Sequence, residues 1–184
     1  MKLKMQLIIN VVIFGTLLIN LPVARSISIS NSLLKQGIIE KAAGNQNGAI
    51  ELFDSALRQT PNLVNAYIER GDAKQRAGKY QSAILDFDRA IKLNPSSRNA
   101  YWARANTKLR LRQTAAALAD YQQVRTLAQK EGDLETIKDM NEQIEHIQTW
   151  MAIATVFAAL LLISLTSGGV IIFRHYQKIK PTFR

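Results

Sequence analysis

The sequence predicts an all-α protein of stacked helical hairpins, because one pattern of residues recurs with a fixed period of 34. The pattern is clearest in residues 64–97, and its offsets recur one period earlier and one period later. The recurring small, aromatic and proline positions are Gly37, Ala49, Phe53, Ala56 and Pro61; Gly71, Ala83, Phe87, Ala90 and Pro95; and Ala105, Ala117 and Tyr121. A repeat of this length is typical of solenoids, in which each unit buries its apolar face only against its neighbours.

Each class of recurring residue has a physical role in such a hairpin. Small residues such as Gly71 and Ala83 let two helices approach closely. Aromatic residues such as Phe87 fill the space between helix layers. Proline cannot continue a helix, so Pro61 and Pro95 end one unit and begin the next.

With these residues the chain resembles the tetratricopeptide repeat family over about residues 30–130. The small-residue and aromatic spacing carries the resemblance, and the third repeat departs from it at Ala105, Val124 and Gln129. The resemblance implies three hairpins and a capping helix, with repeats at 30–63, 64–97 and 98–131 and the cap at 133–149. A stripe of apolar residues spaced three or four apart independently predicts the capping helix: Leu134, Ile137, Met140, Ile144 and Ile147.

The hairpin helices are expected at about 32–43, 48–59, 64–77, 80–93, 98–111 and 114–130. Residues 27–32 alternate isoleucine with polar residues, and we interpret them as a short connector between the first segment and the repeats.

Apolar segments flank the repeats on both sides. Residues 1–26 open with two lysines and continue as an apolar run, which fits either a secretory signal peptide or a retained signal anchor. Residues 151–173 carry no charge and are long enough to span a bilayer, with Trp150 at their edge. Residues 174–184 form a basic tail.

The distribution of charge favours membrane topology over nucleic-acid binding. The net charge is +10, and all 14 acidic residues lie within residues 27–149. The flanks carry basic residues only: Lys2, Lys4, Arg25, Arg174, Lys178, Lys180 and Arg184. Positive flanks stay in the cytoplasm, which predicts repeats on the extracytoplasmic side, in a periplasm or lumen, and a cytoplasmic tail. The alternative is a differently inserted first segment with cytoplasmic repeats.

The resemblance also implies a binding groove lined by the first helix of each repeat. Its candidate residues are Asn31, Leu34, Ile38 and Lys41; Asn65, Ile68, Asp72 and Arg76; and Asn99, Trp102, Asn106 and Arg110. The three recurring asparagines either bond a peptide backbone or begin the helices. Trp102 is either a groove anchor or is packed against a helix or lipid. The basic residues either favour an acidic ligand or are solvated.

One subtype of the family is disfavoured. Co-chaperones that bind the C-terminal Glu-Glu-Val-Asp of heat-shock chaperones use a clamp of lysine, asparagine and arginine. The matching positions here are Leu34, Ile38, Glu69, Asn99 and Ala103, so that clamp is absent.

No residue pattern indicates an enzyme, a metal site or a cofactor. The chain has no cysteine, and its two histidines have no partner at metal-ligand spacing. The prediction is a membrane-tethered adaptor that binds a peptide or protein partner during assembly of a membrane complex. Its layout is similar to that of small membrane-tethered tetratricopeptide proteins that help assemble photosystem I. The alternative is a membrane sensor that passes a binding signal through its transmembrane helix.

Overall fold

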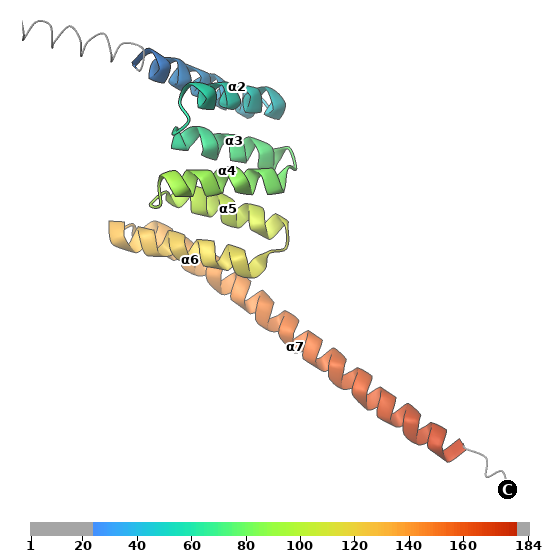
Figure 1. The fold of residues 1–184 in the computed structure, drawn as a ribbon. Coiled ribbons are helices and arrows are strands. Elements are labelled where there is room, and N and C mark those ends of the chain that lie inside the picture. Colours follow the sequence, from blue (N-terminus) through green and yellow to red (C-terminus); the bar gives the residue numbers. More distant parts are fainter. Residues whose placement is uncertain (1–23, 180–184) are drawn as a thin grey trace, which may run out of the picture.

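A computed structural model describes residues 24–179 of the chain, with side chains described up to residue 164. The expected leader or anchor at 1–26 lies almost wholly outside this range and stays a prediction. The described part contains helices and short turns only: residues 24–42, α2 (Gln46–Gln59), α3 (Val64–Arg76), α4 (Tyr80–Leu93), α5 (Arg98–Arg110), α6 (Thr114–Glu131) and α7 (Leu134–Ile179). The first six helices stack as three successive hairpins, and α7 leaves the stack beside α6 (Figure 1). The predicted all-α solenoid is therefore confirmed.

The expected connector at residues 27–32 is wrong, because the first helix runs without a break from residue 24 to residue 42. Ser26 and Ser30 lie one helical turn apart, on the face toward the end of α2. The Ser26 hydroxyl donates to the Gln59 carbonyl at 2.8 Å, and the Ser30 hydroxyl shares a 2.5 Å hydrogen bond with Thr60. The serines thus tie an extra helical stretch to the first hairpin.

The two helices of a hairpin meet where a glycine faces an aromatic ring. A Cβ atom on Gly71 would lie 2.6 Å from the ring of Phe87, which is closer than side chains pack. Gly37 faces Phe53 in the same way. In the third hairpin Ala105 takes the place of glycine, and it is buried in one cluster with Tyr121. The small residues therefore set how closely the helices approach.

The capping helix and the apolar segment form one continuous helix, α7. Gly132 ends α6 in the left-handed conformation, and the Asp133 carboxylate caps α7 by accepting from the Thr136 N–H at 3.0 Å. Met140, Ile144 and Ile147 are buried in the same cluster as the α6 core residues. Leu134, the first residue of the predicted stripe, is instead 78% exposed, since it lies beside the turn.

Repeating ion pairs connect successive hairpins, although no sequence pattern predicts them. Arg70 of α3 pairs with Asp54 of α2 and, at 2.6 Å, with Asp86 of α4. One period later, Arg104 of α5 pairs with Asp88 of α4 and Asp120 of α6. Lys74 and Lys108 add a second cation to Asp86 and Asp120 respectively. Both of these aspartates are only 4% exposed, so each buried carboxylate is compensated by two cations.

Breaking one such ion pair should destabilise the fold far more than breaking an exposed pair on the same helix. Arg70→Ala leaves Asp54 and buried Asp86 without their shared guanidinium and should lower the free energy of unfolding by about 3 kcal/mol. Arg76→Ala removes a side chain that is 58% exposed and should cost less than about 0.5 kcal/mol. Urea unfolding of the full chain in mild detergent, followed by circular dichroism, measures both. An equal loss of unfolding free energy in the two variants would contradict the structural role assigned to the Arg70 ion pairs.

The turn within each hairpin holds its second residue at positive φ. Gly44 and Gly78 occupy this position in the first two repeats, with φ of 85° and 74°. The third repeat places Arg112 there, with φ of 59°. A side chain in this conformation costs about 1–2 kcal/mol, so the third turn carries a local strain that the other two avoid.

Replacing that arginine with glycine should therefore stabilise the protein. Arg112→Gly is expected to raise the free energy of unfolding by about 0.5–1 kcal/mol, since glycine's greater unfolded-state entropy offsets part of the relieved strain. The reciprocal change, Gly78→Arg, should lower the free energy of unfolding by a similar or larger amount. The same urea titration measures both variants, and destabilisation by Arg112→Gly would contradict the conformational argument.

Candidate functional site

The first helices of the second and third repeats, α3 and α5, enclose a hollow, which we call the α3–α5 hollow. Its volume is about 620 Å³. The residues that line it are Asp72, Gln75, Arg76, Trp102, Asn106, Leu109 and Arg110. The groove residues predicted in the later half of these two helices therefore share one hollow. The earlier residues Asn65, Ile68 and Asn99 are not among those that line it.

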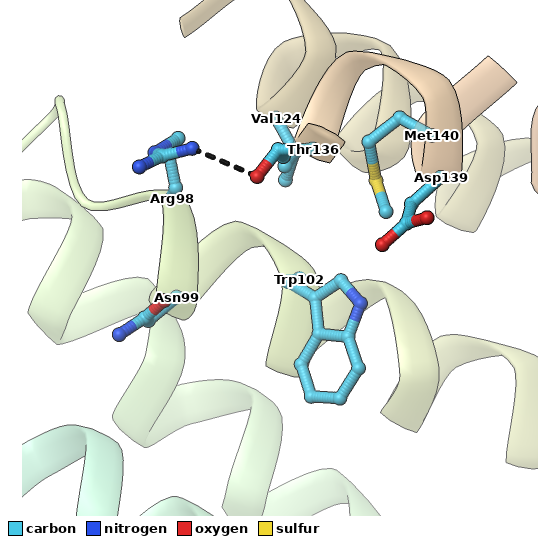
Figure 2. A pocket seen from close by; sticks show the side chains of 7 residues that line it. All are labelled: Arg98, Asn99, Trp102, Val124, Thr136, Asp139 and Met140. Atoms are coloured by element: carbon cyan, nitrogen blue, oxygen red, sulfur yellow. Dashed lines mark hydrogen bonds between the residues drawn. The ribbon is translucent and has the colours of Figure 1, made fainter. Parts of the chain in front are cut away.

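A second hollow of about 320 Å³ lies between α5, α6 and α7, and we call it the α5–α7 hollow. Figure 2 shows the Trp102 indole facing Asp139 and Met140 across it, and Arg98 donating a hydrogen bond to Thr136. Asn99 and Val124 complete its lining. The sequence does not indicate the contribution of Thr136, Asp139 and Met140, because only the packing of α7 on α6 brings the capping helix to the groove.

Trp102 lies on the wall of both hollows. Its side chain is 50% exposed, although it is among the largest apolar groups of the chain. It belongs to neither buried core cluster. A half-exposed indole between two depressions offers an apolar contact surface with a free N–H donor to a partner.

Lys41 is not available to a ligand as a free cation. Its Nζ donates to both Glu69 and Asp72 of α3. Burial alone would lower the pKa of Lys41, but the hydrogen bonds to Asp72 and Glu69 outweigh it and raise the pKa above its ordinary value. Lys41 therefore stays charged and holds the first repeat to the second.

Arg76 and Arg110 are the cations that the α3–α5 hollow exposes. Arg76 makes a 3.2 Å contact with Asp72 on its own helix, yet its side chain is 58% exposed. Arg110 is exposed and forms no ion pair within the described part of the chain. An anionic group placed beside Trp102 would meet these two guanidinium groups.

None of the three recurring asparagines is a helix cap. Asn31 lies in the middle of the first helix, and Asn65 and Asn99 are the second residues of α3 and α5, after the caps Leu63 and Ser97. All three are exposed. The first-turn interpretation therefore fits Asn65 and Asn99, and Asn31 faces solvent from a helix interior.

Other predicted groove residues support the fold. Asn106 accepts a 2.6 Å hydrogen bond from the Tyr121 hydroxyl, which would otherwise be buried without a partner. Leu34 packs against the core cluster of the first hairpin. Ile68 is half-buried, and Ile38 is 39% exposed. The first repeat thus contributes an edge of the groove and lines neither hollow.

Charge at the α6–α7 turn is balanced by Arg98. Its guanidinium pairs with Asp133 at 2.6 Å and with Glu131 at 3.1 Å. The Arg98 hydrogen bond, together with those from Thr136, lowers the pKa of Asp133 to about 2. The capping carboxylate therefore stays ionised near neutral pH, and its support for α7 is lost as the pH falls from the ordinary aspartate pKa of 3.8 through that low value.

The described residues contain no group of three or more histidine, aspartate or glutamate side chains placed to hold a metal ion. His146 instead accepts a 3.0 Å hydrogen bond from the Trp150 indole, one turn along α7.

Comparison with known proteins agrees with this architecture. Residues 68–132 match the tetratricopeptide repeat family model. The first such domain of Spaghetti, solved with the HSP90 peptide SRMEEVD, is 22% identical and has a TM-score of 0.61; the match covers 68% of this chain and 95% of that one. The TPR2B domain of yeast Sti1, in a complex with an Hsp70 peptide, is 16% identical and has a TM-score of 0.63; the match covers 67% of this chain and 98% of that one.

A bacterial structure shares the same fold. The Yersinia enterocolitica type III secretion translocator chaperone SycD is 15% identical with a TM-score of 0.63, and the match covers 67% of this chain and 95% of that one. No curated protein sequence matches significantly.

Proposed function

We propose that this chain, which is a tetratricopeptide repeat protein, is a membrane-tethered adaptor that holds a peptide or protein surface in the hollows on either side of Trp102. The observation that carries the proposal is the half-exposed Trp102 indole. It lies between two depressions that α3, α5 and α7 form together. Exposed tryptophans in such settings often supply much of the binding energy of an interface.

The comparisons support peptide binding as the class of activity. Two of the matched domains are described as bound to chaperone peptides. The carboxylate clamp of such domains has no counterpart here, since its positions hold Leu34, Ile38 and Ala103 in place of charged or amide residues. Of the two remaining clamp positions, Glu69 is an acid that is paired with Lys41, and Asn99 alone keeps an amide. We therefore propose a different ligand, with an apolar anchor for Trp102 and a nearby acidic group for Arg76 and Arg110.

Membrane tethering is proposed from α7. It is the one helix in the described residues that is long and apolar enough to cross a membrane. Its exposed apolar surface begins at Trp150, three residues beyond the buried cap residue Ile147. Tethering confines the groove to the membrane surface and so raises its effective concentration near membrane partners. This setting suits a role in assembling or stabilising a membrane complex.

The sensor alternative has one observation in its favour. Because α7 continues without interruption from the capped domain into the apolar segment, movement of the domain would be passed along the helix. An adaptor should associate with an incomplete complex, whereas a sensor should associate with a kinase or transporter.

Loss of the indole should abolish most of the peptide affinity. In a Trp150→Phe background Trp102 is the sole tryptophan, so its fluorescence reports binding of peptides that combine an apolar and an acidic residue. Peptides selected in this way are then measured by calorimetry against the otherwise wild-type full chain in detergent. Trp102→Ala should weaken binding about tenfold or more.

Leu85→Ala provides the matched control for the indole variant. Leu85 is 68% exposed on α4 and lines neither hollow, so its removal should leave the affinity unchanged. Unchanged affinity of Trp102→Ala would overturn the groove assignment.

The proposed topology places the repeats outside the cytoplasm and the tail within it. Because the chain has no native cysteine, Ser96→Cys in the exposed turn after α4 gives a single labelling site. A membrane-impermeant maleimide should label it in intact cells. Thr182→Cys in the tail should react only after lysis. The reverse pattern would place the repeats in the cytoplasm.

A further inference from the structure

The turn between α5 and α6 differs in chemistry from its two counterparts. The equivalent pairs are Ala43–Gly44 and Ala77–Gly78, which are uncharged and small, whereas the third turn carries Leu111–Arg112. The third turn has an arginine, Arg112, at φ 59°, where the other two repeats have glycine. A residue retained in an unfavourable backbone conformation is a starting point for a functional hypothesis.

The packing of α7 on α6 places this same turn at the start of the apolar segment. The two helices are joined by Gly132 and Asp133 alone, and they bury a common cluster, so they run antiparallel. Helix α6 has 18 residues, and the eighteenth residue of α7 is Met151. Because both helices rise equally per residue, Met151 lies about level with Thr114, the first residue of α6.

Figure 1 shows the same relation, with the α5–α6 turn at the end of the stack from which α7 projects. The turns that precede α3 and α5 lie at the opposite end of these helices. If the bilayer begins near Trp150 and Met151, Leu111 and Arg112 are at the level of its headgroups.

The electrostatic surroundings of the turn are also suited to a negatively charged surface. Arg112 is exposed and forms no ion pair among the described residues. The last acidic residue of the whole sequence is Glu145, nearly two helical turns before Met151. The nearest acid on α6, Asp120, is buried and already paired with Arg104 and Lys108. No acidic side chain of the described residues therefore neutralises Arg112.

We propose that the Leu111–Arg112 turn docks on the anionic headgroups of the bilayer that α7 enters. Arg112 bonds lipid phosphate, and Leu111, which is half-buried, contacts the apolar boundary below it. This second contact, in addition to α7, fixes the tilt of the repeats and thus the direction in which the Trp102 groove opens. The proposal rests on the membrane tethering proposed above and is independent of groove binding.

The test places the cysteine-free full chain in nanodiscs and reports the distance of single sites from the headgroups. Gln113→Cys, in the exposed turn, carries a fluorophore that is quenched by headgroup-spin-labelled lipid. Ser96→Cys, at the opposite end of α5, is the matched control. Nanodiscs of phosphatidylcholine alone are compared with nanodiscs that also contain phosphatidylglycerol.

Quenching at position 113 should exceed that at position 96 and should increase with phosphatidylglycerol. One arginine at an anionic surface corresponds to about a fivefold preference, so Arg112→Gly and Arg112→Gln should each reduce the phosphatidylglycerol-dependent increase by about that factor. Added salt should also reduce the phosphatidylglycerol-dependent increase in quenching, because it screens the attraction between arginine and the lipid.

The two arginine variants separate lipid binding from folding. Arg112→Gly is expected to stabilise the fold, so loss of quenching in that variant cannot come from unfolding. Equal quenching at positions 113 and 96, or an unchanged response in both variants, would overturn the proposal. Failure of the wild-type chain to elute with nanodiscs would overturn the tethering as well. Loss of peptide binding in Trp102→Ala bears on the groove alone.

Discussion

The close contact of a glycine with an aromatic ring is the constraint on which the rest of the solenoid depends. Gly37 against Phe53 and Gly71 against Phe87 bring paired helices so near that no Cβ fits between them. The third repeat adapts the contact with Ala105 and Tyr121, and the added hydroxyl must then be satisfied by Asn106. The tyrosine in the core of the third repeat thus determines the role of one groove residue. The Asn106 side-chain oxygen already accepts the Tyr121 hydrogen bond, so it serves the fold.

Ion pairs between hairpins determine which charges remain for recognition. Arg70 and Arg104 each form ion pairs with carboxylates from two helices. Lys41 forms ion pairs with Glu69 and Asp72. These three cations are therefore structural. The groove consequently presents few free groups, chiefly the Trp102 indole and the Arg110 guanidinium. Such a surface discriminates by the placement of one apolar anchor and a small excess of positive charge.

Sequence periodicity was sufficient to predict the fold, because small and aromatic residues recur at fixed spacing and a buried stripe such as Met140, Ile144 and Ile147 follows the helical period. It could not predict the ion pairs, since Arg70 and Asp86 are separated by sixteen positions and their meeting depends on hairpin geometry. The first helix was also misjudged, because alternating isoleucine and serine conceals Ser26 and Ser30 on one helical face.

The continuity of α7 links these separate features into one mechanical unit. Its first turns bury Met140, Ile144 and Ile147 against α6, and the same helix contributes Asp139 and Met140 to the wall opposite Trp102. The residues that close the groove are therefore rigidly connected to the segment proposed to enter the bilayer. A change in the tilt of α7 would therefore turn the whole stack, and with it the Trp102 groove, unless a second contact holds the stack. The Leu111–Arg112 turn is where the fold offers that contact, and its unfavourable backbone conformation is intelligible as the cost of keeping a charged side chain there.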